Sequence, residues 1–293
     1  LVHKTIDISK LNDLNALNKI RQFNLDIMID VMGYTSRNRI GLFKNRVAKK
    51  QVLWMGYCNT SGLKNMDYII ADRNLIYENE KDSYSEQVIY LPEIWNTHCG
   101  FDFERKEAPP PLIKNNYITF GSFNNPAKIN ENVIDCWSNI LKRVKDSKLI
   151  IKCPDDKKKF DRIENLIEKK GVLDSVIFHK RLENKKDHLN LYNEIDIALD
   201  TFPYNGVTTS FEAIWMGVPV LTMAGYNFNS RCGESINKNL KMEQLIAKNE
   251  EEYISKAVNL SSDREKFMNL RKSIFQNALK TPLFNQENFS KFF

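Results

Sequence analysis

The sequence predicts an α/β protein of two domains, the second of them a doubly wound parallel sheet, and three observations carry this prediction. Short apolar runs alternate with longer helical patterns, which is typical of parallel strands joined by crossover helices. The length of 293 residues suffices for two domains with separate cores. Three consecutive prolines in residues 93–116 oppose both helix and inner strand. This segment is therefore interpreted as a linker between a domain at 1–92 and a domain at 117–293.

The first domain is predicted to contain one amphipathic helix followed by four strands. The helix is expected at 12–23, where apolar residues recur at helical spacing. The four apolar runs are predicted as buried strands: LDIMIDV (25–31), QVLWMGY (51–57), YIIAD (68–72) and QVIYLP (87–92).

The second domain has a more regular alternation of five strands with intervening helices. After the fifth strand the pattern is helical to the end of the chain. The predicted strands are 117–123, 148–153, 175–180, 196–202 and 219–224, and the predicted helices lie near 130–144, 156–170 and 185–193 and from residue 208 onward.

Composition and charge exclude several classes of protein. A hydrophobic content of 42% with 27% charged residues is typical of a soluble globular chain. The net charge of +6 is modest and the lysines are scattered among acids, so no nucleic-acid partner is expected. No apolar run approaches the ~20 residues of a membrane helix, so no membrane partner is expected either.

The cysteines and histidines give no sign of a disulfide framework or a zinc site. The five cysteines form no CxxC pair, and the four histidines lack zinc-ligand spacing. The cysteines are interpreted as small buried residues of a protein in the reducing cytoplasm. The chain begins at Leu1 in mid-pattern without an initiator Met, so it is expected to be part of a longer protein.

Three loops follow predicted strands and carry polar residues that could bind a ligand. In an open parallel sheet, ligands bind at the carboxyl ends of the strands. The loops are FGSFNNPAKIN (120–130), HKRLENKKDH (179–188) and the stretch DTFPYNGVTTSFEAIWMGVP (200–219).

The third loop has two explanations, which the spacing alone leaves open. Thr209 and Glu212 fit a capping box, in which the two side chains satisfy free backbone donors at a helix start. A capping box leaves Thr208 and the turn at Gly206 unexplained. A helix start also presents unpaired N–H groups and a partial positive charge, which favour phosphate.

Lys128 strengthens the anion interpretation, because a lysine just past a strand end supplies a compact charge suited to phosphate. A single loop lysine is more often a plain surface residue. The glycines form neither GxGxxG nor a Walker A loop, which disfavours a dinucleotide site or a P-loop ATPase. No DxD motif is present, which argues against a nucleotide sugar held by a metal ion.

Six blocks along nearly the whole chain, taken together and in order, resemble the catalytic region of glycosyltransferase family 41. That family includes the O-GlcNAc transferases and the SPINDLY-type protein O-fucosyltransferases. The blocks are GYTSRNRIGLF (33–43), VLWMGYCNTSGLKNMDYIIAD (52–72), FGSFNNPAKI (120–129), DIALDTFPYNGVTTSFEAIWMGVPVLTMAG (196–225), LIAKNEEEY (245–253) and TPLF (281–284).

The resemblance implies a GT-B fold of two Rossmann-like domains, with the N-terminal one incomplete in this chain. It implies a nucleotide-sugar donor, inverting transfer to a protein Ser or Thr hydroxyl, and no metal ion or other cofactor. It also implies tetratricopeptide repeats upstream that deliver the protein acceptor.

The resemblance assigns the diphosphate contacts to the first and third loops. Lys128 matches the family lysine that contacts the donor diphosphate and stabilises the leaving group. Thr208 and Thr209 match the helix-start residues that hold the same phosphates, and Gly206 lies in the same donor-binding turn. The stretch 200–219 is thus predicted to be a cap that also serves as a diphosphate cradle.

Five further donor-binding residues follow from the resemblance. His188 falls where animal members place a histidine against the base, and Lys185 is expected near the ribose. Without the family, both are more simply interpreted as a solvated helix surface. Asn125 occupies a donor-contacting position that is Gln in animal enzymes, and Met55 and Gly56 fall in a loop that faces the donor sugar.

The chain departs from the family pattern in several places. Val207 replaces a histidine, and Glu212 replaces an aspartate of the animal enzymes. The linker is shorter than in animal enzymes. The family loop that carries the active-site histidine would lie upstream of Leu1, so no general base is assigned.

The donor and the activity itself have alternatives. FGSFNN and DTFPY are closer to the fucosyl type, whereas YNG is closer to the GlcNAc type. UDP-GlcNAc is the preferred donor, with GDP-fucose as the alternative. A non-catalytic nucleotide-binding scaffold is the alternative from a different class.

Overall fold

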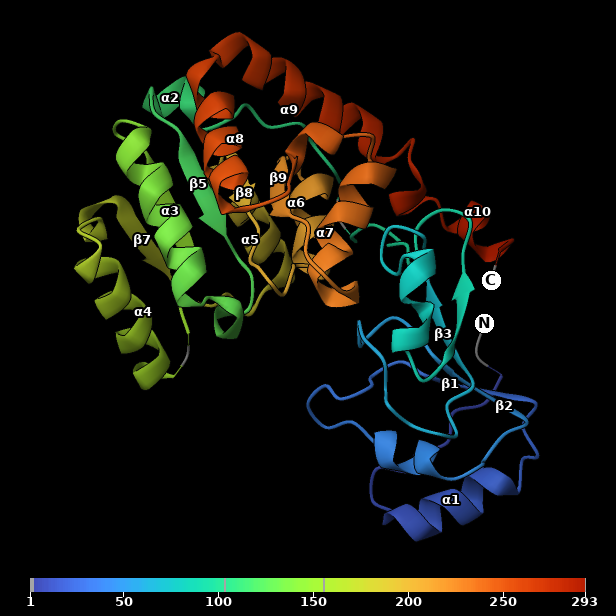
Figure 1. Cartoon of the computed structure of the whole chain (residues 1–293). Coiled ribbons are helices and arrows are strands. Elements are labelled where there is room, and N and C mark those ends of the chain that lie inside the picture. Colours follow the sequence, from blue (N-terminus) through green and yellow to red (C-terminus); the bar gives the residue numbers. More distant parts are fainter. Residues whose placement is uncertain (1–2, 103, 155, 293) are drawn as a thin grey trace. The chain divides into compact units, whose positions relative to one another are not determined.

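The computed structural model of the protein describes residues 3–102, 104–154 and 156–292. Leu1, where the sequence indicates a start in mid-pattern, lies outside these residues. The chain divides into two compact units, Leu1–Trp95 and Asn96–Phe293 (Figure 1). The division falls inside the segment 93–116 that the sequence predicts as a linker.

The first unit is built on a four-stranded parallel sheet in the order β1-β2-β3-β4. Helix α1 precedes the sheet; its N-cap Asn12 accepts a hydrogen bond from the Asn15 backbone N–H. The helices and strands of this unit are α1 (Asp13–Arg21), β1 (Ile27–Asp30), β2 (Lys50–Leu53), β3 (Tyr68–Ala71) and β4 (Gln87–Tyr90), with 3-10 turns at Ile40–Lys44 and Glu78–Ser83.

The prediction that all four strands are buried is wrong for the two edge strands. Ile27 and Ile29 of β1 are 59% and 36% exposed, and β4 alternates exposed and half-buried residues. The inner strands β2 and β3 are mostly buried, as predicted. An edge strand has a neighbour on one side only, so apolar composition alone does not secure its burial.

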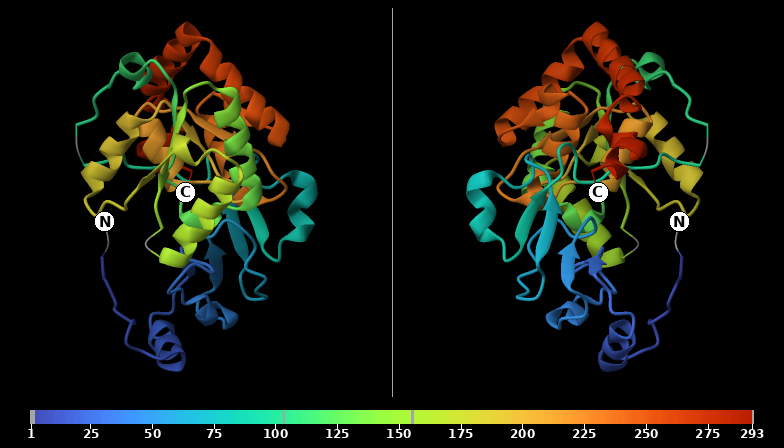
Figure 2. Two further views of the ribbon diagram at one scale, coloured as in Figure 1. Left: turned by 90° about the vertical axis from the view of Figure 1, so that its left-hand side faces the viewer. Right: turned by 90° about the vertical axis from the view of Figure 1, so that its right-hand side faces the viewer.

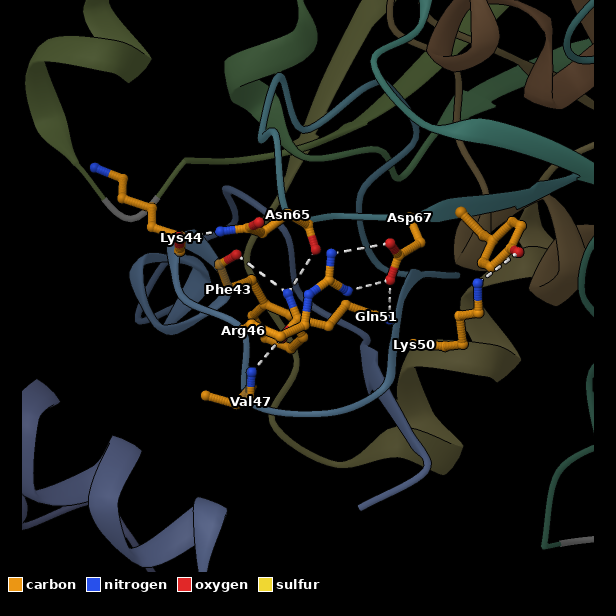
Figure 3. Close-up of polar contacts among 9 residues, drawn as sticks. Phe43, Lys44, Arg46, Val47, Lys50, Gln51, Asn65 and Asp67 are labelled. Atoms are coloured by element: carbon orange, nitrogen blue, oxygen red, sulfur yellow. Dashed lines mark hydrogen bonds and ion pairs between the residues drawn. The ribbon is translucent and has the colours of Figure 1, made fainter. Parts of the chain in front are cut away.

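A fully buried glutamine, Gln51 in β2, organises the backbone around it (Figure 3). Its Oε1 accepts from the Val47 N–H at 2.9 Å, and its Nε2 donates to the carbonyls of Phe43 at 3.2 Å and Asn65 at 2.6 Å. The bonds to Val47 and Phe43 are buried, where a backbone group without a partner is costly, and the bond to Asn65 is part-buried. Gln51 therefore fixes the irregular chain that precedes β2 and β3.

An ion pair lies beside this glutamine. Arg46 donates two hydrogen bonds to the carboxylate of Asp67, and the Gln51 backbone N–H donates to Asp67 Oδ2 at 2.7 Å (Figure 3). The hydrogen bond from Arg46 is the main reason why the pKa of Asp67 is lowered.

The second unit is built on a six-stranded parallel sheet in the order β10-β9-β8-β5-β6-β7. The sequence predicts five of these strands and misses β10, which has only two residues. The strands are β5 (Thr119–Ser122), β6 (Lys148–Lys152), β7 (Val176–His179), β8 (Ile197–Leu199), β9 (Val220–Met223) and β10 (Ile246–Ala247).

Helices connect these strands and cover the sheet. The helices are α2 (Leu112–Asn115), α3 (Glu131–Arg143), α4 (Lys157–Lys169), α5 (Lys185–Asn190), α6 (Thr208–Trp215), α7 (Phe228–Asn239), α8 (Glu250–Ser262), α9 (Arg264–Ala278) and α10 (Gln286–Ser290), with 3-10 turns including Pro126–Lys128, Leu191–Glu194 and Pro282–Phe284. Helices α3, α4 and α8 share one buried core with the sheet, and β5 is visible between α3 and α8 in Figure 1. In both views of Figure 2, α8 and α9 lie together at one end of this unit.

The segment before β5 belongs to this unit and is tied into it. Pro111 adopts helical angles as the N-cap of α2, a position that a proline tolerates because the first turn needs no N–H from it. Leu112 enters the core, and its N–H donates to the buried carboxylate of Asp196 at 3.0 Å. Arg105 lies 3.7 Å from the ring centroid of Phe275 in α9.

Candidate functional site

The strand order of the second unit changes direction between β5 and β8. From β5 the chain proceeds to β6 and β7 on one side of the sheet, whereas β8 leads to β9 and β10 on the other. The loops at the carboxyl ends of β5 and β8 are therefore adjacent, and their chains continue to opposite sides of the sheet. Open parallel sheets bind ligands at such a point. A side-chain contact joins the two loops, because Asn124 Nδ2 donates to Asp200 Oδ1 at 3.1 Å.

The start of α6 has no side-chain cap, so the capping box expected from Thr209 and Glu212 is wrong. Val207 is the N-cap residue. Thr209 Oγ1 donates instead to Asn124 Oδ1 at 2.8 Å, and Glu212 is bonded to side chains of another segment. Tertiary partners thus replace the local cap. Within the described residues, no acceptor pairs with the backbone N–H of Thr208 or Thr209.

Lys128 lies at the end of the 3-10 turn that follows β5. Its Nζ donates to the Asn205 carbonyl oxygen at 2.7 Å and lies 4.2 Å from the ring centroid of Tyr204. The structure therefore brings this lysine against the turn that precedes α6. The positive charge of Lys128 therefore lies near the start of α6, at the point between β5 and β8 where the strand order reverses.

Glu212 joins α6 to the segment that carries His188. His188 Nε2 and the Tyr192 hydroxyl lie 3.2 Å and 3.0 Å from Glu212 Oε2, and the same hydroxyl lies 3.2 Å from the Thr209 carbonyl oxygen. The His188 side chain is 18% exposed, so the solvated-surface interpretation is wrong for this residue. Burial and the Glu212 charge raise the pKa of Tyr192 well above its usual value.

Lys185 lies on the same short helix as His188, and the Asn125 carbonyl oxygen accepts from the Lys128 backbone N–H at 2.9 Å. Lys185 is exposed, and its Nζ lies 5.0 Å from the ring centroid of Phe101. Asn125 is also exposed, and its Oδ1 accepts from the Ala127 backbone N–H at 3.1 Å.

Gly206 is fixed inside the turn by close contacts. Its N–H donates to Asp200 Oδ1 at 2.7 Å. A Cβ at this position would lie 2.5 Å from Thr209 Oγ1 and 2.7 Å from Asn124 Oδ1, so only glycine fits the present arrangement.

Met55 and Gly56 lie in the first unit, in the loop that follows β2. Met55 is exposed and has a positive φ of 73°. A Cβ on Gly56 would lie 1.9 Å from the Val31 carbonyl oxygen, so this loop packs directly on the loop after β1. Both residues therefore occupy the carboxyl end of the first unit's sheet.

Sequence reasoning missed Asp200, whose carboxylate accepts four hydrogen bonds within the described part of the chain. The aspartate ends the apolar run IALD and is 1% exposed. Burial raises the pKa of its carboxyl group, and hydrogen bonds from the Gly206 N–H and the Thr222 hydroxyl act in the opposite direction. The sequence does contain one signal for this residue, because Asp200 is a charged residue directly after an apolar run that predicts a buried strand.

His98 was also missed and packs beside α6. Its ring lies 4.4 Å from that of Phe101 and 6.0 Å from that of Phe211, and its Nδ1 accepts from the Gly100 N–H at 3.0 Å. Burial lowers the pKa of His98, and the charge of Lys185 acts in the same direction. No motif in the sequence marks this histidine.

The cysteines match the expected burial only in part. None of the five, all of which lie among the described residues, forms a disulfide; Cys99 is exposed and Cys153 is half-buried. Across residues 3–102, 104–154 and 156–292, no three His, Cys, Asp or Glu side chains gather as a metal site. Over the same ranges, no helix combines the length and apolar character that crossing a membrane requires.

Comparisons with known proteins find relatives along almost the whole chain. The chain is 36% identical over 292 residues to the tomato (Solanum lycopersicum) protein named "Probable UDP-N-acetylglucosamine--peptide N-acetylglucosaminyltransferase SPINDLY", covering 97% of this chain and 31% of that protein. It is 28% identical over 295 residues to the Arabidopsis thaliana protein of the same description named SEC, covering 96% and 30%. The chain thus spans less than a third of the length of these relatives.

Solved structures confirm the predicted fold class. An O-GlcNAc transferase mutant from Thermobaculum terrenum matches 97% of this chain and 54% of its own, with a TM-score of 0.90 and 29% identity. A sucrose-phosphate synthase from Thermosynechococcus elongatus matches 98% of this chain and 78% of its own, with a TM-score of 0.64 and 13% identity, and shares the fold alone. The fold is therefore α/β of the GT-B type. The sequence profile of Glycosyl transferase family 41 matches residues 2–99 and 112–292, and the chain belongs to that family.

Proposed function

We propose that the protein is a glycosyltransferase that moves GlcNAc from UDP-GlcNAc to Ser or Thr hydroxyls of proteins, with inversion and without a metal ion. The observation that carries this proposal is the meeting of Lys128 with the uncapped start of α6 between β5 and β8. The names of the relatives support a peptide acceptor and a UDP-GlcNAc donor. Because the chain spans less than a third of those relatives, the activity proposed is that of the whole protein.

The diphosphate of the donor would bind at the start of α6. Among the residues that the structure describes, the N–H groups of Thr208 and Thr209 in the first turn have no acceptor. The helix dipole adds partial positive charge there. Lys128 would exchange its hydrogen bond to the Asn205 carbonyl for one to a phosphate oxygen, a stronger charge-assisted bond.

These groups would act mainly on the departing nucleoside diphosphate. Negative charge grows on the diphosphate in the transition state, and donors fixed beforehand stabilise it without reorganisation. Lys128 and the two N–H groups thereby take the role that a metal ion has in other nucleotide-sugar enzymes.

Further residues would contact the nucleoside and the sugar of the donor. His188, Lys185 and Asn125 would lie toward the nucleoside, and Met55 and Gly56 toward the sugar. The acceptor would be a protein delivered by tetratricopeptide repeats upstream in a cytoplasmic protein. GDP-fucose is the alternative donor, because FGSFNN and DTFPY are closer to the fucosyl type.

Thermal unfolding with UDP, GDP, UDP-GlcNAc and GDP-fucose tests the donor class. A ligand at a hundred times its dissociation constant should stabilise the chain by about 2.7 kcal/mol. Lys128→Ala should abolish this shift, whereas Lys142→Ala, at an exposed position on α3, is the matched control and should retain it.

Each outcome of this experiment selects one function. A shift with uridine nucleotides alone supports GlcNAc transfer, and a shift with guanosine nucleotides alone supports fucosyl transfer. A folded chain that responds to none of the four ligands contradicts both and favours a scaffold. A shift that survives Lys128→Ala contradicts the role of that lysine.

A further inference from the structure

One buried carboxylate is hydrogen-bonded to both loops of the candidate diphosphate site. Asp200 Oδ1 accepts three hydrogen bonds: from the Gly206 N–H at 2.7 Å, the Thr201 N–H at 2.9 Å and Asn124 Nδ2 at 3.1 Å. Its Oδ2 accepts a fourth from the Thr222 hydroxyl at 2.8 Å. A residue that is 1% exposed thus has all its hydrogen-bonding capacity directed at named partners.

The two oxygens face different parts of the unit. Oδ1 is bonded to the loops after β5 and β8, and Oδ2 to Thr222 in β9. The Asp200 backbone carbonyl accepts from the Tyr253 hydroxyl in α8 at 2.9 Å. The carboxylate is therefore anchored to the sheet through Oδ2 and hydrogen-bonded to the two loops through Oδ1.

The bonds continue from Oδ1 to the helix start. Asn124 uses its amide N–H to reach Asp200 and its Oδ1 to accept from the Thr209 hydroxyl at 2.8 Å. Gly206, bonded to the same oxygen, accepts on its carbonyl from the Ser210 hydroxyl at 3.2 Å. Two independent routes thus run from one carboxylate oxygen to the first turn of α6.

An ionised Asp200 carboxylate close to the proposed site would repel the diphosphate, so its presence there must have a compensating benefit. Burying a carboxylate is costly unless its hydrogen bonds are complete, and here they are. A hydrogen bond to a charged acceptor is also stronger than one between neutral groups. The gain is a rigid turn, with Lys128 close enough to offset part of the charge.

We propose that Asp200 is a positioning residue for the diphosphate site. Its carboxylate fixes Gly206 and Asn124, and through them it holds the Thr208 and Thr209 N–H groups in the orientation that receives phosphate. This role rests on the proposed function, since it presupposes that a nucleoside diphosphate binds at α6.

The test compares four variants by calorimetric titration with UDP and UMP, or with GDP and GMP if the wild-type chain binds guanosine nucleotides. Asp200→Ala removes the acceptor, and we expect UDP to bind about ten- to a hundredfold more weakly. The affinity for UMP, which lacks the second phosphate, should decrease less than the affinity for UDP. Asp200→Asn should rescue UDP binding to within about threefold, because its amide oxygen can accept the same three bonds and its NH₂ can donate to Thr222.

Two further variants separate positioning from general stability. Thr222→Val removes the bond on the sheet side of the carboxylate, so it should lower the melting temperature and leave UDP affinity unchanged. Asn124→Ala removes one route to α6 and should weaken UDP binding, and it provides the test if Asp200→Ala does not fold.

The outcomes distinguish this inference from the proposed function. If the wild-type chain binds neither UDP nor GDP, the proposed function fails and the role of Asp200 fails with it. If the wild-type chain binds UDP and the Asp200→Ala and Asn124→Ala variants bind it equally well, only the inference is overturned. Equal losses of UDP affinity in Thr222→Val and Asn124→Ala would also overturn the inference. They would indicate that both variants weaken binding by destabilising the fold and not by releasing the start of α6.

Discussion

Replacing Gly206 with alanine should disrupt the site with the smallest possible change in chemistry. The added Cβ would lie 2.5 Å from Thr209 Oγ1, 2.7 Å from Asn124 Oδ1 and 3.1 Å from Asp200 Oδ1. The first two distances are shorter than any carbon–oxygen contact tolerates, and those two oxygens form the 2.8 Å hydrogen bond between the β5 loop and α6. The methyl group must therefore displace the turn or break this bond.

The magnitude follows from two contributions. Overpacking a tight site by one methyl group costs about 1–3 kcal/mol. Loss of one buried hydrogen bond costs about 1 kcal/mol more. Stability should therefore fall by about 2–4 kcal/mol, which corresponds to a decrease of roughly 4–16 °C in melting temperature for a unit of this size. Binding of UDP or GDP should weaken in parallel, because the N–H groups of α6 move with the turn.

Thermal unfolding and nucleotide titration measure both effects, with Gly41→Ala as the matched control. A Cβ on Gly41 would meet only Asp13 Oδ2, at an ordinary 3.5 Å, so stability should be unchanged or slightly higher. If Gly206→Ala melts with the wild-type chain and binds nucleotide with unchanged affinity, the reasoning about this turn is refuted.

Three other predictions address the hydrogen-bond networks of the two units. Gln51→Leu should destabilise the first unit by about 2–3 kcal/mol or more in urea unfolding, because it removes two buried hydrogen bonds to the backbone and one part-buried bond; a loss below about 1 kcal/mol would contradict this. Because Arg46 lowers the pKa of Asp67 below 3.8, the ionised carboxylate stabilises the fold above that value, and the contribution disappears as the pH falls through the lowered pKa. The difference in unfolding free energy between the wild-type chain and Asp67→Asn should therefore be constant near neutral pH and shrink in acid; a difference that grows in acid would have the wrong sign. Tyr192→Phe should cost about 1–2 kcal/mol, since it removes the hydroxyl bonded to Glu212, and a melting temperature equal to that of the wild-type chain would show that this bond contributes nothing.

Much of the fold could be predicted because apolar runs and helical periodicity are local signals. The strand at 148–153 and the helix at 130–144 were predicted within about two residues of the observed β6 and α3. β10 was missed because two residues give no pattern, and its pairing with β9 depends on a neighbour more than twenty residues away in the chain. The exposure of Ile27 could not be predicted, because burial depends on what packs against the sheet face and not on composition.

The candidate site was predictable where a local spacing or a family motif marks it. Lys128, Gly206, Thr208 and Thr209 lie together as expected from sequence, but the capping box did not form. Glu212 has the right spacing to cap the helix, and the spacing contains no information about the His188 and Tyr192 side chains that bind it instead. Asp200 was overlooked for the same reason, since its partners come from three separate segments of the chain.

The neighbouring position of β5 and β8 has a consequence for the order in which the molecule folds. Lys128 and the Asn205 carbonyl are 77 residues apart in the chain, and the whole β6–β7 half of the sheet is made between them. Closing so long a loop is entropically costly, and contacts of high sequence separation form slowly. The β5–β6–β7 half can pair as soon as it is synthesised, whereas the ligand loops acquire their structure only when β8 docks beside β5. The backbone amides of Thr201 and Gly206 should then be among the last in this unit to become protected from hydrogen exchange during refolding. The β5–β6–β7 part of the sheet would thus form before the candidate diphosphate site.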